Sequence, residues 1–155
     1  MKTSYFESAL GWLEIRESSK GIAQVNFIDQ PPFHTVSSKN STGVQHLLDY
    51  FNEKKDCVNA VFDLQGTAFQ KKVWRKLKEI PFGTTIDYES LAKELGCIQF
   101  TRAVAKANSQ NPIPILIPCH RVIGKSGSLT GYLGGLEKKE WLLKHEGVIT
   151  QTSLF

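Results

Sequence analysis

A cysteine and a histidine stand next to each other at the end of the segment NPIPILIPCHRV, residues 111–122. A thiol becomes a good nucleophile only as the thiolate, and a nearby imidazole is a common way of producing one. Because prolines restrict the local backbone, we expect a rigid segment to present Cys119. The alternative is that Ile115 to Cys119 is a buried strand that ends in cysteine, since free cysteine is among the most buried residue types.

Two further features lie downstream of this segment. Glycines are dense in residues 124–127 and 131–135, which indicates tight turns or close backbone approach beside the thiol. They do not form a phosphate loop, because neither GxxxxGK[ST] nor GxGxxG occurs. Glu146 follows a predicted helix, where a carboxylate is poorly placed against the helix dipole. It is therefore either a solvated surface residue or held by a specific partner such as His120.

The cysteines and histidines form no other recognisable site. Cys57, Cys97 and Cys119 are widely spaced without a CxxC pair, and the four histidines make no metal-ligand pattern with them. This argues against a disulfide framework and predicts a reducing compartment and no structural zinc. No apolar run is long enough to span a bilayer and the N-terminus has no apolar signal core, so we expect neither membrane insertion nor secretion.

Charge is distributed unevenly along the chain, whose formal net charge is +4. Residues 1–66 carry six Lys/Arg and eight Asp/Glu, whereas residues 67–155 carry thirteen basic and seven acidic side chains. A basic second half is what a polyanionic partner such as a nucleic acid requires. A lysine-rich solvated surface is the alternative interpretation.

The sequence predicts an α+β fold with two domains, at residues 1–66 and 67–155. In the first, residues 12–16 and 25–27 alternate apolar and polar as strands do, and residues 58–64 predict one more strand. Between them, four apolar residues at i, i+3, i+4 and i+7 predict a helix; they are Val44, Leu47, Leu48 and Phe51.

The second domain is predicted to be mostly helical. Thr67 and Gln70 have the spacing of a capping box, and Asp87 is placed to cap the next helix, which Gly96 ends. Thr101 is then expected to cap a third helix after only a few residues. Two short helices joined by a tight turn predict a winged-helix-like domain with a helix-turn-helix. A last helix over residues 136–145 is expected to turn Trp141, Leu142 and Leu143 inward.

The third of these helices combines cations with small side chains. Its expected exposed face combines the two cations Arg102 and Lys106 with small side chains such as Ala103, whereas major-groove recognition helices usually project long polar side chains to reach base edges. Ala103 and Ala107, one turn apart, would allow the close approach that a narrow minor groove needs. Alternatively, these alanines are ordinary helix formers that pack against a neighbouring element.

Three patterns together resemble the O6-alkylguanine-DNA alkyltransferase family, over roughly residues 67–147. They are Asn111-Pro-x-Pro-x-x-x-Pro118-Cys119-His120-Arg121-Val122, Gly131-Tyr132-x-Gly134-Gly135, and Lys144-His145-Glu146-Gly147. The first sixty-odd residues are compatible with the variable N-terminal domain of that family. The resemblance implies a DNA repair protein that flips O6-alkylguanine out of duplex DNA and transfers the alkyl group irreversibly to its own cysteine, without a cofactor.

The resemblance also implies roles for individual residues. Cys119 resembles the alkyl acceptor, His120 the base that draws its proton through a water, and Glu146 the acid that orients the imidazole. Asn111 resembles the residue that bridges the helix-turn-helix to the active-site segment, and Arg102 the arginine that enters the base stack. The remaining residues are expected in the lesion pocket (Tyr132, Leu133, Gly134, Pro114 and Val122) or on DNA (Tyr88, Ala103, Lys106 and Arg121).

The resemblance further implies a monomer that binds double-stranded DNA from the minor groove, with O4-alkylthymine as an additional substrate. The expected location is the cytoplasm and nucleoid in a prokaryote and the nucleus in a eukaryote. Leu133 stands where some members of the family have serine, which bears on pocket shape and on tolerance for bulky alkyl groups.

Three other functions remain as alternatives. Non-catalytic lesion sensors share the pattern but commonly have tryptophan in place of the cysteine. A Cys-His-Glu hydrolase uses the same groups, but neighbouring side chains in an extended segment point to opposite faces, which disfavours direct contact between Cys119 and His120. A plain DNA-binding regulator would leave the cysteine segment unexplained.

Overall fold

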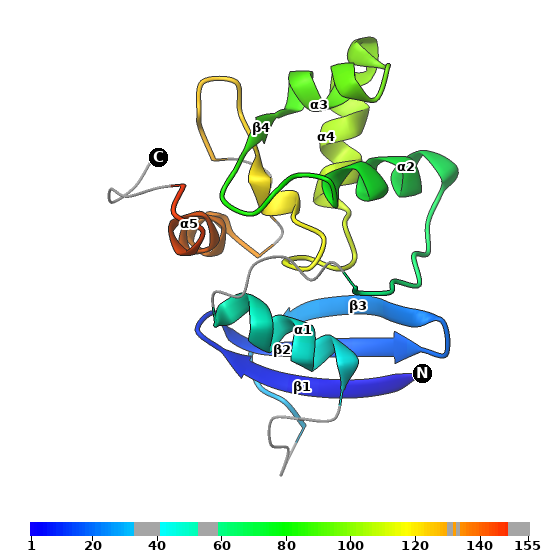
Figure 1. Ribbon diagram of the computed structural model, residues 1–155, viewed down its shortest axis with the longest axis vertical. Helices are drawn as coiled ribbons and strands as arrows, with labels where there is room; N and C mark the ends of the chain where they lie inside the picture. The colour runs from blue at the N-terminus through cyan, green and yellow to red at the C-terminus, as the bar shows by residue number, and fades with distance from the viewer. Residues whose placement is uncertain (33–40, 53–58, 130–131, 133, 149–155) are drawn as a thin grey trace. The chain divides into compact units, whose positions relative to one another are not determined.

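The chain divides into two compact units in the computed structural model, which describes residues 1–32, 41–52, 59–129, 132 and 134–148 (Figure 1). Unit 1 consists of Met1–Gln65 and Pro112–Leu116, and unit 2 of Gly66–Asn111 and Ile117–Phe155. The division after Gln65 lies one residue before the predicted boundary. The second half, however, contributes a short segment to unit 1: Val25 N–H donates to the carbonyl of Pro112 at 2.9 Å.

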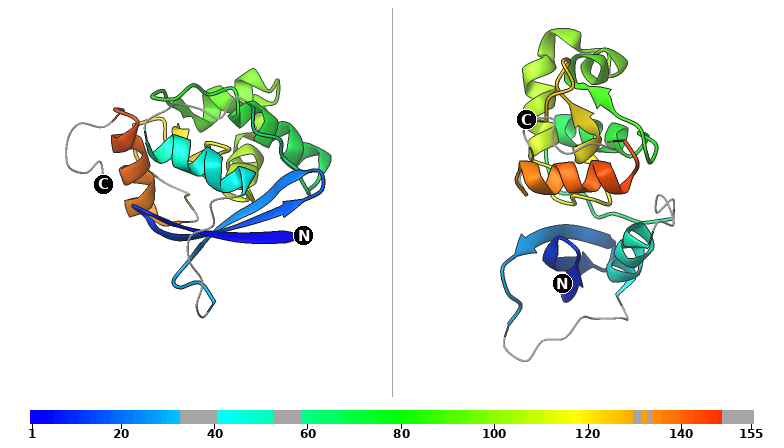
Figure 2. Two further views of the ribbon diagram at one scale, coloured as in Figure 1. Left: turned by 60° about the horizontal axis from the view of Figure 1, so that its bottom comes forward. Right: turned by 90° about the vertical axis from the view of Figure 1, so that its left-hand side faces the viewer.

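Unit 1 is a three-stranded antiparallel meander covered by one helix (Figures 1 and 2). Strands β1 (Lys2–Ser8), β2 (Gly11–Ser18) and β3 (Gly21–Ile28) pair in sequence order. Helix α1 (Thr42–Phe51) begins at the side-chain cap Ser41. Apolar side chains of the sheet and of α1 form the core; they include Leu13, Ile15, Val25, Val44 and Leu47. The predicted helix and the two predicted strands are confirmed.

The strand predicted over residues 58–64 is wrong in extent. Val58 lies outside the described residues, and from residue 59 onward only Phe62 forms a bridge, parallel to Ile22. Gly21 allows this close approach, because it has φ +143° and a Cβ there would lie 2.5 Å from the carbonyl oxygen of Val61. From residue 59 onward the segment thus adds this bridge to the sheet, and a hydrogen bond from Ser18 Oγ to the Asp63 carboxylate at 2.5 Å lies beside it.

Unit 2 begins with the predicted capping box. Thr67 Oγ1 accepts the Gln70 N–H at 3.1 Å, and Gln70 Oε1 accepts the Thr67 N–H at 2.9 Å. Helix α2 (Ala68–Leu77) follows and buries Trp74. The indole Nε1–H of Trp74 donates to the carbonyl of Ala107 at 2.8 Å. This bond fixes α2 against the helix that carries the predicted DNA-contact residues.

The helix-turn-helix is present. Helix α3 (Tyr88–Glu94) begins at Asp87, whose carboxylate accepts the Ser90 N–H at 2.8 Å, and Gly96 follows its end with φ +75°. Helix α4 (Thr101–Ser109) packs against α2 and α3. The capping role predicted for Thr101 is wrong. A 3₁₀ turn over Ile98–Phe100 runs directly into α4, so Thr101 is already helical and Phe100 occupies the cap position.

The rest of unit 2 contains two very short strands and the last helix, α5. Strands β4 (Ile86–Asp87) and β5 (Val122–Ile123) pair in parallel, and α5 (Leu136–His145) ends before Gly147, which has φ +80°. The inward face predicted for this helix is only partly right. Trp141 is half-buried and stacks on His145 with ring centroids 5.0 Å apart, whereas Lys139 is fully buried.

Candidate active site

Cys119, His120 and Arg121 form a 3₁₀ turn that follows Pro118, and all three side chains are buried. The alternative of a strand from Ile115 to Cys119 is wrong. Ile115 has φ +74°, a strained conformation for a β-branched residue, and it interrupts any extended run. In a 3₁₀ turn, neighbouring side chains diverge by about 120° rather than pointing to opposite faces.

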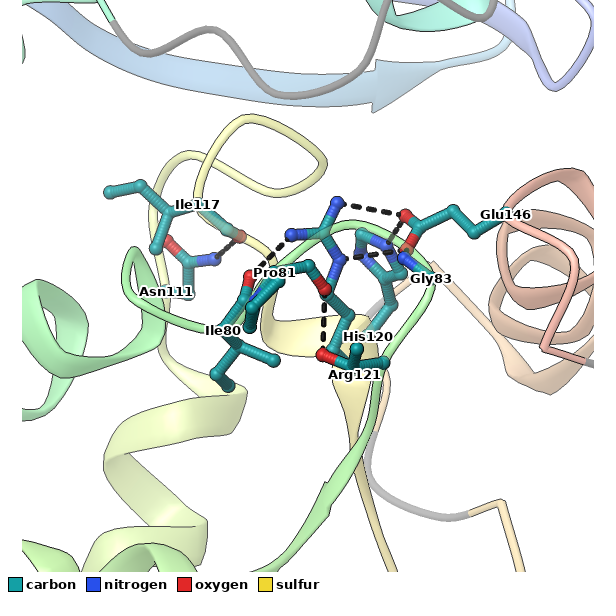
Figure 3. A network of polar contacts seen from close by, with 9 residues as sticks. Ile80, Pro81, Gly83, Asn111, Ile117, His120, Arg121 and Glu146 are labelled. Carbon is teal, nitrogen blue, oxygen red and sulfur yellow. Dashed lines mark hydrogen bonds and ion pairs between the residues drawn. The ribbon is translucent and has the colours of Figure 1, made fainter.

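Two asparagines connect the end of α4 to the cysteine segment. Asn111 Nδ2 donates to the carbonyl of Ile117 at 2.7 Å (Figure 3). Asn108 Nδ2 makes a longer contact of 3.5 Å with the carbonyl of Cys119. Both asparagines are buried, so these contacts hold the backbone around the thiol relative to α4. Asn111 therefore lies where a bridging residue must lie.

Glu146 is the centre of a buried polar network (Figure 3). His120 Nε2 lies 2.5 Å from Glu146 Oε2. Arg121 donates from Nε to Oε1 at 2.8 Å and from Nη2 to Oε2 at 3.1 Å. The N–H of Gly83 donates to Oε1 at 3.1 Å. Of the two interpretations of Glu146, a partner-held acid is correct and a solvated one is wrong.

This network sets the protonation states of the acid and the imidazole. Burial opposes ionisation of Glu146, but the hydrogen bonds from His120 and Arg121 and the positive charge of Arg121 outweigh it and lower its pKa to about 2. Burial lowers the pKa of His120 against the opposing effect of Glu146. A neutral imidazole that donates from Nε2 to an ionised carboxylate keeps its lone pair on Nδ1. Nδ1 is therefore the basic atom of His120.

Arg121 is not available to contact DNA, so that prediction is wrong. Its side chain is fully buried, and besides Glu146 it donates from Nη1 to the carbonyl of Ile80 at 2.6 Å. The guanidinium also lies over the ring of Phe82, with 5.6 Å from Cζ to the centroid. Arg121 thus joins the loop after α2 to the cysteine turn and supplies the positive charge that keeps Glu146 ionised.

The thiol of Cys119 is protonated at rest. Burial raises its pKa to about 11, although a hydrogen bond from the Asn111 side chain and the charge of Lys139 act in the opposite direction. A thiol with this pKa is a poor nucleophile at neutral pH until a base removes its proton. Neutral His120 is the nearest such base in the turn. Tyr132 is also buried, and burial followed by the charges of Cys119 and Glu146 raises its pKa well above 10, so it remains a hydrogen-bond donor.

Lys139 is a buried cation that sequence reasoning missed. Its Nζ donates to the carbonyl of Val122 at 2.6 Å and lies 6.0 Å from the ring centroid of Tyr88. Burial lowers its pKa to about 8, against the effect of Cys119. The available signal was periodicity: Lys139, Leu142 and Glu146 lie at i, i+3 and i+7, on the buried side of α5 and its cap. Lysine is so rarely buried that this signal is easily discounted.

The other predicted residues are placed as follows. Arg102, Ala103 and Lys106 are exposed on α4, but Ala107 is buried beneath Trp74, so the close approach predicted for Ala107 is wrong.

Val122 and Tyr132 lie in the buried part of unit 2 beside Lys139 and Cys119, and Tyr88 begins α3. Gly134 is half-buried before α5. Pro114 belongs to unit 1, and Leu133 lies outside the described residues.

The described part of the chain contains neither a candidate metal cluster nor a candidate membrane span. No group of three or more His, Cys, Asp or Glu side chains there could hold a metal ion. No helix in the same part is both long and apolar enough to cross a membrane.

Comparison with known proteins agrees with this geometry. Residues 68–148 match the sequence profile of the 6-O-methylguanine DNA methyltransferase DNA-binding domain. The chain belongs to this methyltransferase family. The matched region contains the helix-turn-helix, the cysteine turn and Glu146, and thus every residue of the polar network.

Individual family members match over most of their length. A Methanosarcina acetivorans protein named methylated-DNA–protein-cysteine methyltransferase is 40% identical over 154 residues, which are 95% of this chain and 99% of that protein. The Mycobacterium tuberculosis OGT, solved in complex with DNA, has a TM-score of 0.82 and 37% identity, and the match covers 93% of this chain and 91% of that one. Atl1 of S. pombe, solved with damaged DNA containing O6-carboxymethylguanine, has a TM-score of 0.50 and 30% identity over 58% of this chain and 86% of its own.

The buried Glu146 carboxylate predicts a pH-dependent stability. Glu146→Gln should cost about 3–5 kcal/mol at neutral pH, because it leaves the buried Arg121 without its partner. The pKa of Glu146 is lower in the folded state than its unfolded value of 4.5, so the ionised carboxylate contributes its full stabilisation above pH 4.5. This contribution to the free energy of unfolding is lost as the pH falls towards 2. Denaturant unfolding at several pH values should therefore show the gap to wild type closing over this range. Glu137→Gln, an exposed change on the same helix, should stay within about 0.5 kcal/mol of wild type. A constant gap would contradict this account.

Lys139 should affect the reactivity of the thiol. Below its pKa of about 8, the ammonium attracts the Cys119 thiolate, so in Lys139→Met the pH profile of Cys119 alkylation should fall below the wild-type profile at pH values under 8 and join it at higher pH, where the lysine is already neutral. The profile is measured with iodoacetamide and peptide mass spectrometry, with circular dichroism as a check on folding. Lys144→Met, an exposed lysine of α5, is the matched control. An unshifted profile in a folded Lys139→Met protein would exclude this electrostatic role.

Proposed function

We propose that this chain is a DNA repair protein that transfers the alkyl group of O6-alkylguanine in duplex DNA to its own Cys119. The observation that carries the proposal is the buried Cys119–His120–Glu146 arrangement, connected through Asn108 and Asn111 to the helix-turn-helix. The names of the relatives, methylated-DNA–protein-cysteine methyltransferases, support the same reaction.

The first step is activation of the thiol. His120 Nδ1 takes the proton of Cys119 through a bridging water, because side chains that diverge by about 120° are poorly placed for direct contact. Glu146 holds the imidazole through Nε2 and stabilises the imidazolium that forms. Arg121 holds Glu146 ionised throughout.

The second step is displacement at the alkyl carbon. The Cys119 sulfur forms a bond to this carbon as the bond between carbon and guanine O6 breaks, and negative charge develops on the departing base. Tyr132, which keeps its phenolic hydrogen, donates to the base as this charge develops. The proton taken by His120 is returned to the guanine, so the reaction is balanced without a cofactor.

The product is a thioether, which has no easy hydrolytic exit. Each molecule therefore acts once. An alkyltransferase of this kind differs from a Cys-His hydrolase, which must release its acyl group to turn over. It also differs from a lesion sensor, which binds damaged DNA without losing its thiol.

The helix-turn-helix explains how the thiol reaches a base within a duplex. A base must leave the stack to enter a buried site, and another group has to fill the gap. Arg102 is exposed on α4, six residues before Asn108, or about 9 Å along the helix axis. Minor-groove contact by the small and cationic side chains Ala103 and Lys106 would place Arg102 in the gap while the base enters the pocket.

The proposal extends to several finer points. We infer that the protein acts on DNA as a monomer and that O4-alkylthymine is a second substrate, because an alkyl carbon on that oxygen is open to the same displacement. Its location follows that of its DNA: the cytoplasm and nucleoid in a prokaryote and the nucleus in a eukaryote.

Transfer can be tested by mass spectrometry with a duplex oligonucleotide that contains O6-methylguanine. Wild type should gain one methylene on the Cys119 peptide, saturating at one per protein with a matching loss from the DNA. Cys119→Ser should lose transfer and still bind the duplex. Retained transfer in Cys119→Ser would refute the assignment. If wild type binds the damaged duplex without transfer, the protein is a lesion sensor. If wild type neither binds the duplex nor accepts the methyl group, a Cys-His hydrolase becomes the favoured function.

Arg102 should matter only when the base has to leave a duplex. Arg102→Ala should slow transfer from duplex DNA by about tenfold or more, and should leave transfer from the free base O6-methylguanine unchanged. Single-turnover rates on the two substrates make the comparison. Equal losses on both would exclude a role in flipping.

A further inference from the structure

Two large apolar side chains are exposed on the 3₁₀ turn between α3 and α4. Phe100 is 54% exposed and Ile98 is 48% exposed, and none of the three residues of the turn is buried. The α3–α4 turn lies at the end of unit 2 away from α5 (Figures 1 and 2). Isolated apolar residues on a surface are ordinary, but these two lie two positions apart, and they precede Arg102 by four and two residues.

The turn holds these side chains on a fixed backbone. The N–H of Phe100 donates to the carbonyl of Cys97 at 2.8 Å, and Thr101 Oγ1 donates to the carbonyl of Ile98 at 2.6 Å. Cys97 is itself buried, so the turn is anchored to the interior of unit 2. Rigid presentation reduces the ordering cost when an exposed apolar side chain binds.

The surface around the turn is cationic. Lys93, Arg102 and Lys106 are all exposed, and no aspartate or glutamate occurs between Glu94 and Glu137. The carboxylate of Glu94 pairs with another lysine, since its Oε1 lies 3.5 Å from Lys76 Nζ. An apolar pair surrounded by positive charge is complementary to a groove of DNA lined by phosphates. A second copy of the chain would place the same cations opposite one another across a two-fold interface, which opposes self-association there.

We propose that Phe100, with Ile98 beside it, is an apolar wedge that enters the minor groove next to Arg102 and unstacks the adjoining base step. The inference rests on the proposed function, since it takes duplex DNA as the partner. Phe100 ends the 3₁₀ turn that runs directly into α4 and precedes Arg102 by two residues, so both side chains lie at the start of the helix, where they can contact neighbouring steps of one groove. Arg102 therefore fills the place of the lesion, and Phe100 opens the neighbouring step.

The test uses the Cys119→Ser background, in which binding is measured without transfer. The probe is a duplex with O6-methylguanine and 2-aminopurine at a neighbouring base, whose fluorescence rises when the base unstacks. Phe100→Ala should abolish most of the rise and weaken binding about tenfold, in the range for loss of one aromatic–base contact. Ile98→Ala should have a smaller effect. Val61→Ala, at an apolar residue of unit 1 that is 64% exposed, should change neither quantity.

Salt dependence separates a wedge from a charge effect. An apolar contact releases no counterions, so Phe100→Ala should leave the slope of log affinity against log salt unchanged. Lys106→Ala should reduce that slope by about one. Phe100→Trp keeps an aromatic ring and should retain the fluorescence rise.

Several results would overturn the wedge. They are wild-type affinity and fluorescence in Phe100→Ala, a Phe100→Trp protein that behaves like Phe100→Ala, or a wild-type dimer in sedimentation velocity that Phe100→Ala dissociates. With Cys119 intact, Phe100→Ala should transfer from the free base at the wild-type rate; a loss there would also refute a role confined to DNA. Failure of the proposed function is seen separately, as a wild-type protein that binds the duplex without transferring its methyl group.

Discussion

The buried carboxylate of Glu146 accepts hydrogen bonds from His120, from Arg121 and from the backbone of Gly83. These donors come from the cysteine turn and the loop after α2, while Glu146 itself caps α5. An isolated buried carboxylate would be very costly, so the three segments have to meet for any one of them to be stable. The same bonds that hold the segments together also keep the acid ionised and orient the imidazole. Stability and reactivity in unit 2 thus both depend on the ionised carboxylate of Glu146.

The Cys119 thiol has low nucleophilicity at rest for the same reason that the site is stable. Burial that strengthens the Glu146 network also raises the pKa of Cys119 to about 11, so the resting protein presents a thiol and not a thiolate. Lys139 and Asn111 offset part of this effect without reversing it. A protein that reacts once benefits from such a state, because a protonated thiol is poorly reactive towards oxidants and other electrophiles until a proper substrate arrives.

Helix α4 connects the residues predicted to contact DNA with the segment that carries the Cys119 thiol. Its end contacts the cysteine segment through Asn108 and Asn111, and its start carries Arg102 and the exposed Phe100. Trp74 fixes the helix from the opposite side through the carbonyl of Ala107. Because a helix is rigid over nine residues, the length of α4 fixes the distance between the exposed Arg102 and the cysteine segment.

The local features can be predicted from the amino-acid sequence: the capping box at Thr67, the cap at Asp87, the helix-turn-helix, and the grouping of Cys119 with His120. These depend on interactions between residues close in the chain. Three features could not be predicted in this way and depend on contacts between distant segments: Arg121 faces Glu146 and not DNA, Lys139 is buried, and Phe100 is exposed. Charged residues are expected outside and aromatic ones inside, and this expectation fails where distant segments supply a buried partner or leave a turn uncovered.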